Sequence, residues 1–333
     1  SDLSLCPGRP LRTREFEIAG QPTAIPVIDI HTVGAGGGSL ARLDAGGALH
    51  VGPQSAGAQP GPICYGRGGT GVTVTDAHVW LGRLPVDAFL GGEETLDREA
   101  IRAPLEEMAA LLGTDVDAAA EGVLAVADTA MEGALRVISV ERGYDPADFA
   151  VVAFGGAGGL HVAELTRRLG ALKAMVPPDP GLLSAYGMLA SPVSRETART
   201  VLLLTDAAGT EESVHRTLTE LEDQARTQML DEGISEEDLT AELWVDARYA
   251  GQSFELRVPA SDWVQRFHTA HEERYGNRRE TAPVEAVTLR AVVTAPPPPL
   301  NVTRLPDAKG PVRGESTQVA FAGERIEASR VWR

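Results

Sequence analysis

Two glycine clusters carry most of the chemistry that this sequence offers. One is Gly155-Gly156-Ala157-Gly158-Gly159, which lies between the all-apolar run Ala150–Phe154 and a predicted helix over His161–Leu169. Glycines between a buried strand and a helix N-terminus let backbone N–H groups approach an anion or a nucleotide closely. The cluster is not a dinucleotide fingerprint, because His161 stands at the place of the third glycine, and it is not a P-loop, because no Gly-Lys-Ser/Thr follows. An anion-binding loop and a tight turn without a ligand both remain open.

A second glycine cluster follows two residues that could do acid–base chemistry. Its members are Gly34, Gly36, Gly37, Gly38 and Ser39. Just before it, Asp29 and His31 stand two positions apart on a predicted strand, so their side chains would share one face. Asp76 and His78 repeat the spacing, and the two pairs would complete a four-ligand metal shell if the fold brought them together. Otherwise these histidines are hydrogen-bonding structural residues.

Composition narrows the class of protein. The 333 residues include 43% hydrophobic and 23% charged side chains, as in folded globular proteins. Lys and Arg number 30 and Asp and Glu 47, so the net charge is 30 − 47 = −17, which disfavours nucleic-acid binding. No apolar stretch approaches the roughly 18 residues of a membrane span. The only cysteines, Cys6 and Cys64, suit a reducing compartment, and we predict a cytoplasmic protein in which Cys64 is a buried, inert thiol.

The elements that must position the glycine clusters alternate between helix and strand. Apolar spacing predicts helices over Leu96–Leu112 and Asp117–Glu141, ahead of the strand at Ala150–Phe154 and a second buried strand at Ala174–Val176. This organisation indicates an α/β domain. The remainder has an acidic helical region, a helix over Trp263–Tyr275 and a strand over Val284–Val293. We therefore expect an α/β domain over 1–200 and a smaller α+β domain over 201–333.

A set of motifs, in a fixed order, resembles the hydantoinase A/oxoprolinase family. The matching segments are Asp29–Ser39, Gly61–Gly69, Val74–Ala77, Leu81–Leu84, Val140–Pro146, Ala153–His161, Val176-Pro177, Pro180-Gly181, Ser184–Gly187, Arg248–Gln252, His271–Gly276 and Leu289-Arg290. That family includes ATP-dependent N-methylhydantoinases, 5-oxoprolinases and subunits of acetone and acetophenone carboxylases. Each motif alone is modest, and their shared order makes the resemblance specific.

The resemblance implies an actin-like ATPase (ribonuclease H-like) fold and an ATP-dependent reaction. Its expected chemistry is phosphorylation of a cyclic amide or imide carbonyl oxygen by ATP and Mg²⁺, which prepares the ring for hydrolysis. Gly155–Gly159 would bind the nucleotide, Gly34–Ser39 would face the phosphates or the substrate, and Asp29 and His31 are candidate catalytic residues. The implied partner is a hydantoinase B/oxoprolinase-type subunit or domain.

Part of the family pattern is missing from this sequence. The family carries two Asp-x-Gly-Gly-Thr phosphate loops, and Ser1-Asp2 resembles the last residues of the second. We therefore expect the actin-like domain to be incomplete, the chain to be the C-terminal part of such a subunit, and the chain alone not to turn over ATP. Two alternatives are a subunit of an ATP-dependent ketone carboxylase and a nucleotide-dependent module without hydrolase chemistry.

Overall fold

The computed structural model describes residues 1–333 apart from 9, 14–15, 19–20, 24–26, 88, 90–91, 298, 300–313 and 332–333. The chain folds into two compact units: unit 1 is Ser1–Ser184 with Arg304–Arg333, and unit 2 is Ala185–Thr303. The predicted division at residue 200 differs from this one. Strand β11 (Val193–Leu204) crosses residue 200 as one element of unit 2, and the last described hairpin belongs to unit 1.

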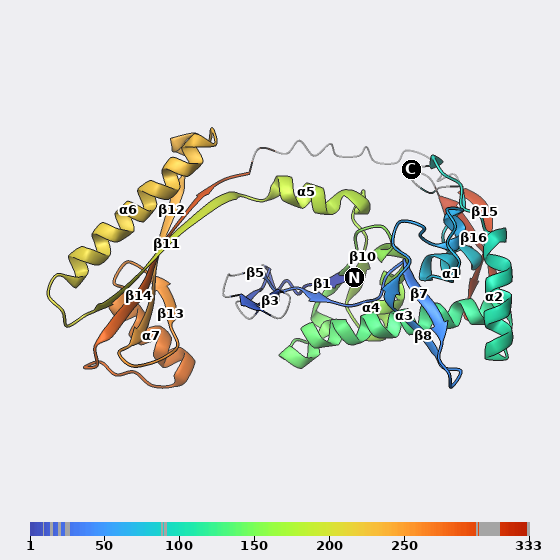
Figure 1. Ribbon diagram of the computed structural model, residues 1–333, viewed down its shortest axis with the longest axis horizontal. Helices are drawn as coiled ribbons and strands as arrows, with labels where there is room; N and C mark the ends of the chain where they lie inside the picture. Colours follow the sequence, from blue (N-terminus) through green and yellow to red (C-terminus); the bar gives the residue numbers. More distant parts are fainter. Residues whose placement is uncertain are drawn as a thin grey trace. The chain divides into compact units, whose positions relative to one another are not determined.

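The described helices of unit 1 pack against one another (Figure 1). They are α1 (Val74–Trp80), α2 (Glu99–Leu112), α3 (Val116–Ile138) and α4 (Gly158–Leu169). Helix α1 begins at a capping box, in which Thr73 and Asp76 satisfy each other's backbone N–H groups, and α3 begins where the Asp115 side chain accepts from the Ala118 amide. Helix α4 ends at Gly170 in the left-handed conformation. Short 3₁₀ turns lie at Ile63–Tyr65, Val140–Arg142, Pro146–Asp148, Pro180–Leu182 and, in unit 2, Glu236–Asp238.

The described strands of unit 1 form pairs. Antiparallel pairs are β1 (Asp2–Leu3) with β6 (His31–Thr32), β2 (Arg12–Thr13) with β5 (Val27–Ile28), β3 (Phe16–Ile18) with β4 (Gln21–Thr23), β7 (Ser39–Leu43) with β8 (Leu49–Ser55), and β15 (Gly314–Phe321) with β16 (Glu324–Val331). Strands β9 (Ala150–Val152) and β10 (Lys173–Met175) pair in parallel.

The prediction that β9 and β10 are buried strands is wrong for this chain. Val152 is 47% exposed, Phe154 50% and Met175 44%. The run of apolar residues is typical of a parallel strand inside a covered sheet. Here β9 pairs with β10 alone among the described strands, so those side chains remain accessible.

A small apolar cluster of Ala35, Met131 and Leu165 joins α3 to α4, and a larger apolar cluster holds the other helices of unit 1 together. It joins α1, α2 and α3, with Ile101, Leu105 and Val123 fully buried. The hairpin β15–β16 adds Ala320, whose amide donates to the Leu81 carbonyl at 2.9 Å. Asp117 of α3 accepts from the Arg325 guanidinium at 2.8 and 2.9 Å, so the last described strand is fastened to this helical core.

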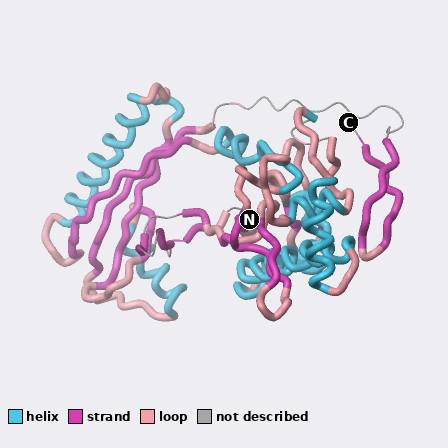
Figure 2. Tube along the Cα trace, turned by 45° about the vertical axis from the view of Figure 1, so that its right-hand side comes forward, coloured by secondary structure: helices cyan, strands magenta, loops and turns pink. Residues whose placement is uncertain are grey.

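Unit 2 is an antiparallel sheet with helices on one face. The strand order is β11–β14–β12–β13, with β12 at Thr240–Tyr249, β13 at Leu256–Pro259 and β14 at Val284–Ala295. Figure 2 shows these strands side by side, with α6 (Thr210–Asp231) along them. Helix α7 (Trp263–Tyr275) packs Trp263 and Phe267 into the same cluster as Leu218 of α6. Helix α5 (Leu183–Ala190) spans the division between the units. The α+β character of this part is as predicted.

Candidate functional site

The two predicted glycine loops lie in contact. A Cβ built on Gly37 would lie 3.4 Å from the Cβ of Ala157 and 2.8 Å from Oγ1 of Thr75. Only a residue without a side chain fits at Gly37. Loops far apart in the sequence are therefore brought together at Gly37 and Ala157.

Helix α1 holds the loop Gly34–Ser39 in place. Both the amide and Oγ1 of Thr75 donate to the Gly37 carbonyl at 2.9 Å. Within the loop, the buried Ser39 hydroxyl accepts from the Gly36 amide at 3.0 Å. The Ser39 hydroxyl was predicted to face the phosphates or the substrate, but in the structure it already takes part in a hydrogen bond within the loop.

Several backbone amides of the two loops have no acceptor. In the described part of the chain, the amides of Gly37 and Gly38 donate no hydrogen bond, and neither do those of Gly156, Ala157, Gly158 and Gly159. The Ala157 cap of α4 provides no side-chain acceptor. The first N–H groups of a helix have no intrahelical partner, and they attract negative charge. Unpaired amides from both loops thus lie around the Gly37–Ala157 contact.

Gly155 has a different role from the other glycines of its loop. Its φ is 86°, a conformation that favours glycine, and its amide donates to the Pro180 carbonyl at 2.8 Å. The N–H of Gly155 is therefore used to attach the loop to the turn at 177–182. A Cβ on Gly155 or Gly156 would meet no atom within 4 Å, so the space beside this end of the loop is open.

The structure separates Asp29 from His31. Asp29 lies between β5 and β6, outside both strands, so the two side chains do not share a strand face as predicted. The chain passes there from one strand pair to another, which breaks the two-residue alternation. The Asp29 carboxylate is ion-paired with Arg142, and this hydrogen bond raises the pKa of the Arg142 guanidinium. The catalytic role of Asp29 and His31 stays a prediction.

Asp76 is a structural residue. Its carboxylate, fully buried, accepts from the amides of Ile63, Cys64 and Thr73 at 3.2, 2.8 and 2.9 Å, and from Oγ1 of Thr73 at 2.8 Å. Burial, and then the charge of Asp76, raise the pKa of the Cys64 thiol. Cys64 is therefore buried, as expected, and its raised pKa disfavours the reactive thiolate.

The proposed four-ligand metal shell does not form. No group of three His, Cys, Asp or Glu among the residues that the structure describes could hold a metal ion. His78 instead faces His161, with 3.4 Å between their Nε2 atoms, and Nδ1 of His161 lies 2.6 Å from Oδ1 of Asp128.

Sequence reasoning missed three of the residues that shape this site. Thr75, Asp128 and Arg142 were not singled out, and His161 was noted only as a departure from a glycine pattern. The spacing of Thr73 and Asp76 is a capping-box signal that would have placed the start of α1 correctly. The contact of His161 with Asp128 spans 33 positions and has no local signal.

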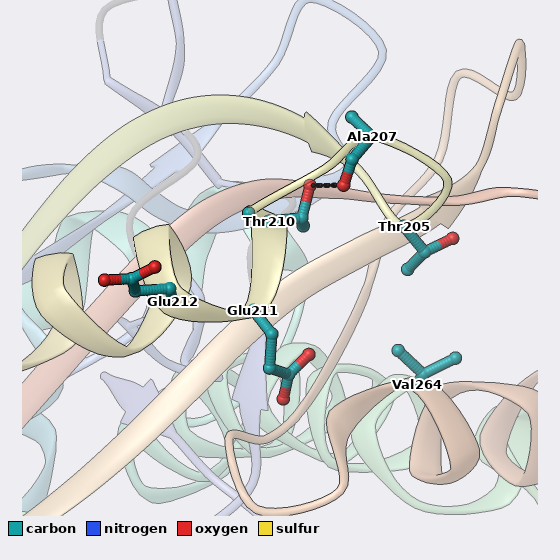
Figure 3. A pocket seen from close by; sticks show the side chains of 7 residues that line it. Thr205, Ala207, Thr210, Glu211, Glu212 and Val264 are labelled. Carbon is teal, nitrogen blue, oxygen red and sulfur yellow. Dashed lines mark hydrogen bonds between the residues drawn. The ribbon is translucent and has the colours of Figure 1, made fainter.

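A cavity of unit 2 has different chemistry. About 470 Å³ in volume, it is lined by Thr205, Ala207, Gly209, Thr210, Glu211, Glu212 and Val264. Figure 3 shows the Glu211 carboxylate between α6 and Val264, while Thr210 bonds back to the Ala207 carbonyl at 3.0 Å. Two carboxylates at this helix start disfavour an anionic ligand, so we do not place the nucleotide there.

Within the described residues, no helix is both long and apolar enough to cross a membrane.

Fold and loops define a mixed α/β protein whose glycine loops place unpaired amides together. The family model for hydantoinase/oxoprolinase matches residues 1–197. The chain belongs to the hydantoinase/oxoprolinase family.

Three comparisons show the range of that family. The chain is 36% identical to the caprolactamase subunit alpha of Pseudomonas jessenii over 315 residues, which cover 90% of this chain and 45% of that protein. The crystal structure of ATP-dependent caprolactamase from the same organism aligns with a TM-score of 0.66 at 32% identity, over 94% of this chain and 48% of that one. The nucleotide-free structure of an ATP-dependent acetone carboxylase aligns with a TM-score of 0.83 at 26% identity, over 97% of this chain and 49% of that one. The chain thus spans about half the length of these relatives.

Proposed function

We propose that this chain is part of an ATP-dependent enzyme that activates a cyclic amide or imide for hydrolysis. The observation that carries the proposal is the contact between Gly37 and Ala157, which brings the unpaired amides of both glycine loops together. The family membership and the ATP-dependent caprolactamase among its structural neighbours support it. The actin-like fold is part of the proposal.

The loop residues fit a nucleotide phosphate chain. Backbone N–H groups bind phosphate oxygens without needing a cationic side chain, and the N-terminal end of α4 adds its dipole. The open space beside Gly155 and Gly156 leaves room for the nucleoside. The described residues contain no cluster that fits Mg²⁺, which commonly binds through phosphates with few protein ligands. In this proposal the metal stays with the nucleotide.

The reaction class follows from the chemistry of an amide. Its carbonyl carbon is a poor electrophile, and transfer of the γ-phosphoryl group to its oxygen, with release of ADP, supplies a phosphate leaving group. One water then adds to the activated carbon and the C–N bond breaks, which opens the ring and leaves an acyl phosphate; a second water hydrolyses the acyl phosphate to the carboxylate and free phosphate. Such transfer depends mainly on positioning and charge stabilisation, which the loop amides provide.

We assign nucleotide binding to Gly156–Gly159, with Gly155 as the residue that anchors the loop, and phosphate or substrate contact to Gly37 and Gly38.

A second candidate is a subunit of an ATP-dependent ketone carboxylase. The acetone carboxylase structure has the higher TM-score, although its identity is lower than that of the caprolactamase. Both candidates use the same phosphoryl donor and differ in the acceptor. The caprolactamase relative is named as a subunit. We therefore also propose that this chain has a partner of the hydantoinase B/oxoprolinase type.

The test is ADP release by the full-length protein with its partner subunit. We expect ADP to be released only when a lactam, a hydantoin or 5-oxoproline is present. The amount of ADP released should equal the amount of ring-opened product formed. Release that requires a ketone and bicarbonate would assign the carboxylase reaction instead. Nucleotide binding without turnover on either class would contradict both and leave a non-catalytic nucleotide-dependent module.

A further inference from the structure

Three buried ionisable side chains connect helices α1, α3 and α4. His78 of α1, His161 of α4 and Asp128 of α3 are 1%, 2% and 6% exposed. Nδ1 of His161 lies 2.6 Å from the Asp128 carboxylate, and its Nε2 lies 3.4 Å from Nε2 of His78. Polar groups of this kind are costly to bury unless they are paired, so a helical core that keeps three of them invites a functional explanation.

The hydrogen bonds define the tautomers in this array. The Asp128 carboxylate only accepts, so Nδ1 of His161 donates to it and Nε2 of a neutral His161 is an acceptor. Nε2 of His78 is then the donor, and its Nδ1 has no partner among the described residues. Burial, and next the neighbouring His161 and Arg83, lower the pKa of His78 to about 3, which keeps His78 neutral at pH 7.

Each end of the array is attached to one glycine loop. Thr75 lies one turn before His78 on α1, and its amide and hydroxyl both donate to the Gly37 carbonyl at 2.9 Å. His161 lies in the first turn and a half of α4, which begins with Gly158 and Gly159. A shift of His161 relative to His78 would therefore change the separation of Gly37 and Ala157.

We propose that His78 and His161 are positioning residues whose hydrogen bond, oriented by Asp128, sets the spacing of the two glycine loops. Neither side chain contacts the nucleotide. The bond keeps the loop amides at the separation that a phosphate chain needs, as precise positioning of this kind determines affinity. The identity of the ligand rests on the proposed function, whereas the loop spacing itself does not.

The experiment compares His78→Leu, His78→Gln and His161→Asn in the full-length protein with its partner. Leucine removes the donor at similar size, glutamine restores an N–H at the position of Nε2, and asparagine keeps the bond to Asp128 while losing the contact with His78. We expect the KM for MgATP to rise at least tenfold in His78→Leu and His161→Asn, with a smaller change in kcat, and to return most of the way in His78→Gln. His215→Leu, an exposed histidine of unit 2, is the matched control.

Hydrogen exchange of the same variants without nucleotide gives an independent readout. We expect faster exchange in the peptides covering 34–39 and 155–161 for His78→Leu, and near wild-type exchange for His78→Gln. Unchanged exchange and unchanged KM in His78→Leu would overturn the proposal, as would a His78→Gln variant impaired as much as His78→Leu. If His78→Leu does not fold, His161→Asn decides by the same criteria. A wild type that binds no ATP, with the exchange differences intact, refutes the proposed function and leaves the spacing role standing.

Discussion

Both units bury charged side chains, and they do so in opposite ways. In unit 2, the Asp246 carboxylate is 1% exposed and receives Nε of Arg257 at 2.9 Å and Nε of Arg290 at 2.7 Å. Arg290 also donates to Glu196 at 2.7 Å. Among the described residues, each network leaves one side-chain nitrogen without a hydrogen-bond partner, Nη2 of Arg257 in unit 2 and Nδ1 of His78 in unit 1. The difference is that the His78–His161–Asp128 array of unit 1 is connected to loops whose amides are unpaired.

The difference separates a structural network from a functional one. The carboxylate of Asp246 is saturated by side chains of its own sheet, which stabilises the sheet and leaves little to offer a ligand. The loops of unit 1 keep amide donors that folding has not used, and the residues that carry these amides are half-buried or exposed, so a ligand can reach them. We therefore propose that the ligand binds in unit 1, and we treat the charges around Asp246 as support for the sheet.

The largest expected effect is in unit 2. Asp246→Ala leaves the guanidinium groups of Arg257 and Arg290 without their carboxylate, and we expect a loss of about 3–5 kcal/mol in the free energy of unfolding. The affinity for MgATP of the protein that remains folded should not change. Glu220→Ala, which removes an exposed pair with Arg199, is the control and should cost less than about 1 kcal/mol. Urea denaturation measures the free energy of unfolding, and calorimetric titration measures the affinity for MgATP. A strong loss of affinity in Asp246→Ala would contradict the distinction between the units.

Acid should weaken unit 1 through His78. The pKa of His78 is about 3 in the folded protein and about 6.5 when unfolded, because the ring is buried and lies near His161 and Arg83, and its Nδ1 has no compensating partner among the described residues. Between these values the unfolded state binds more protons, so the free energy of unfolding falls as the pH falls below about 6.5. The loss should be on the order of 2–3 kcal/mol by pH 4.5. Denaturant titrations at pH 7 and pH 4.5 should show this loss of unfolding free energy in the wild type, and His78→Leu should lack it. An equal pH dependence of stability in the two proteins would contradict the prediction.

A smaller effect tests the loop contact itself. In Gly37→Ala the new methyl group would meet Oγ1 of Thr75 at 2.8 Å and crowd Ala157, so the loops must move apart. We expect MgATP affinity to fall about tenfold or more, which corresponds to about 1.4 kcal/mol. The matched control is Gly133→Ala in α3, where a Cβ meets nothing within 4 Å. That variant should bind normally and gain about 0.5–1 kcal/mol in stability. Equal affinity in both variants would remove the basis for a shared site.

Sequence patterns predicted the elements better than the site. The helix over Trp263–Tyr275 is as expected, and β14 extends the predicted Val284–Val293 by only two residues, because continuous apolar periodicity marks both. The exposure of Val152 and Phe154 could not be predicted, since an apolar run does not reveal how many neighbouring strands a sheet has.

The glycine loops were found from sequence, but their contact was not. Strand–glycine–helix order identifies an N-terminal end of a helix with free amides. It does not identify the partner of His161, because Asp128 and His78 are 33 and 83 positions away and the packing of α1, α3 and α4 decides the contact. The shared strand face predicted for Asp29 and His31 is absent for a local reason, because β5 ends at Ile28.

The central claim is that the loops at 34–39 and 155–159 bind one phosphate chain together. Amide hydrogen exchange of the full-length protein with its partner, with and without MgATP, tests it most directly. The account predicts that nucleotide slows exchange in the peptides covering both loops over the same concentration range, with little change around Asp246. Protection confined to one loop, or absent from both while nucleotide binds elsewhere, would contradict it.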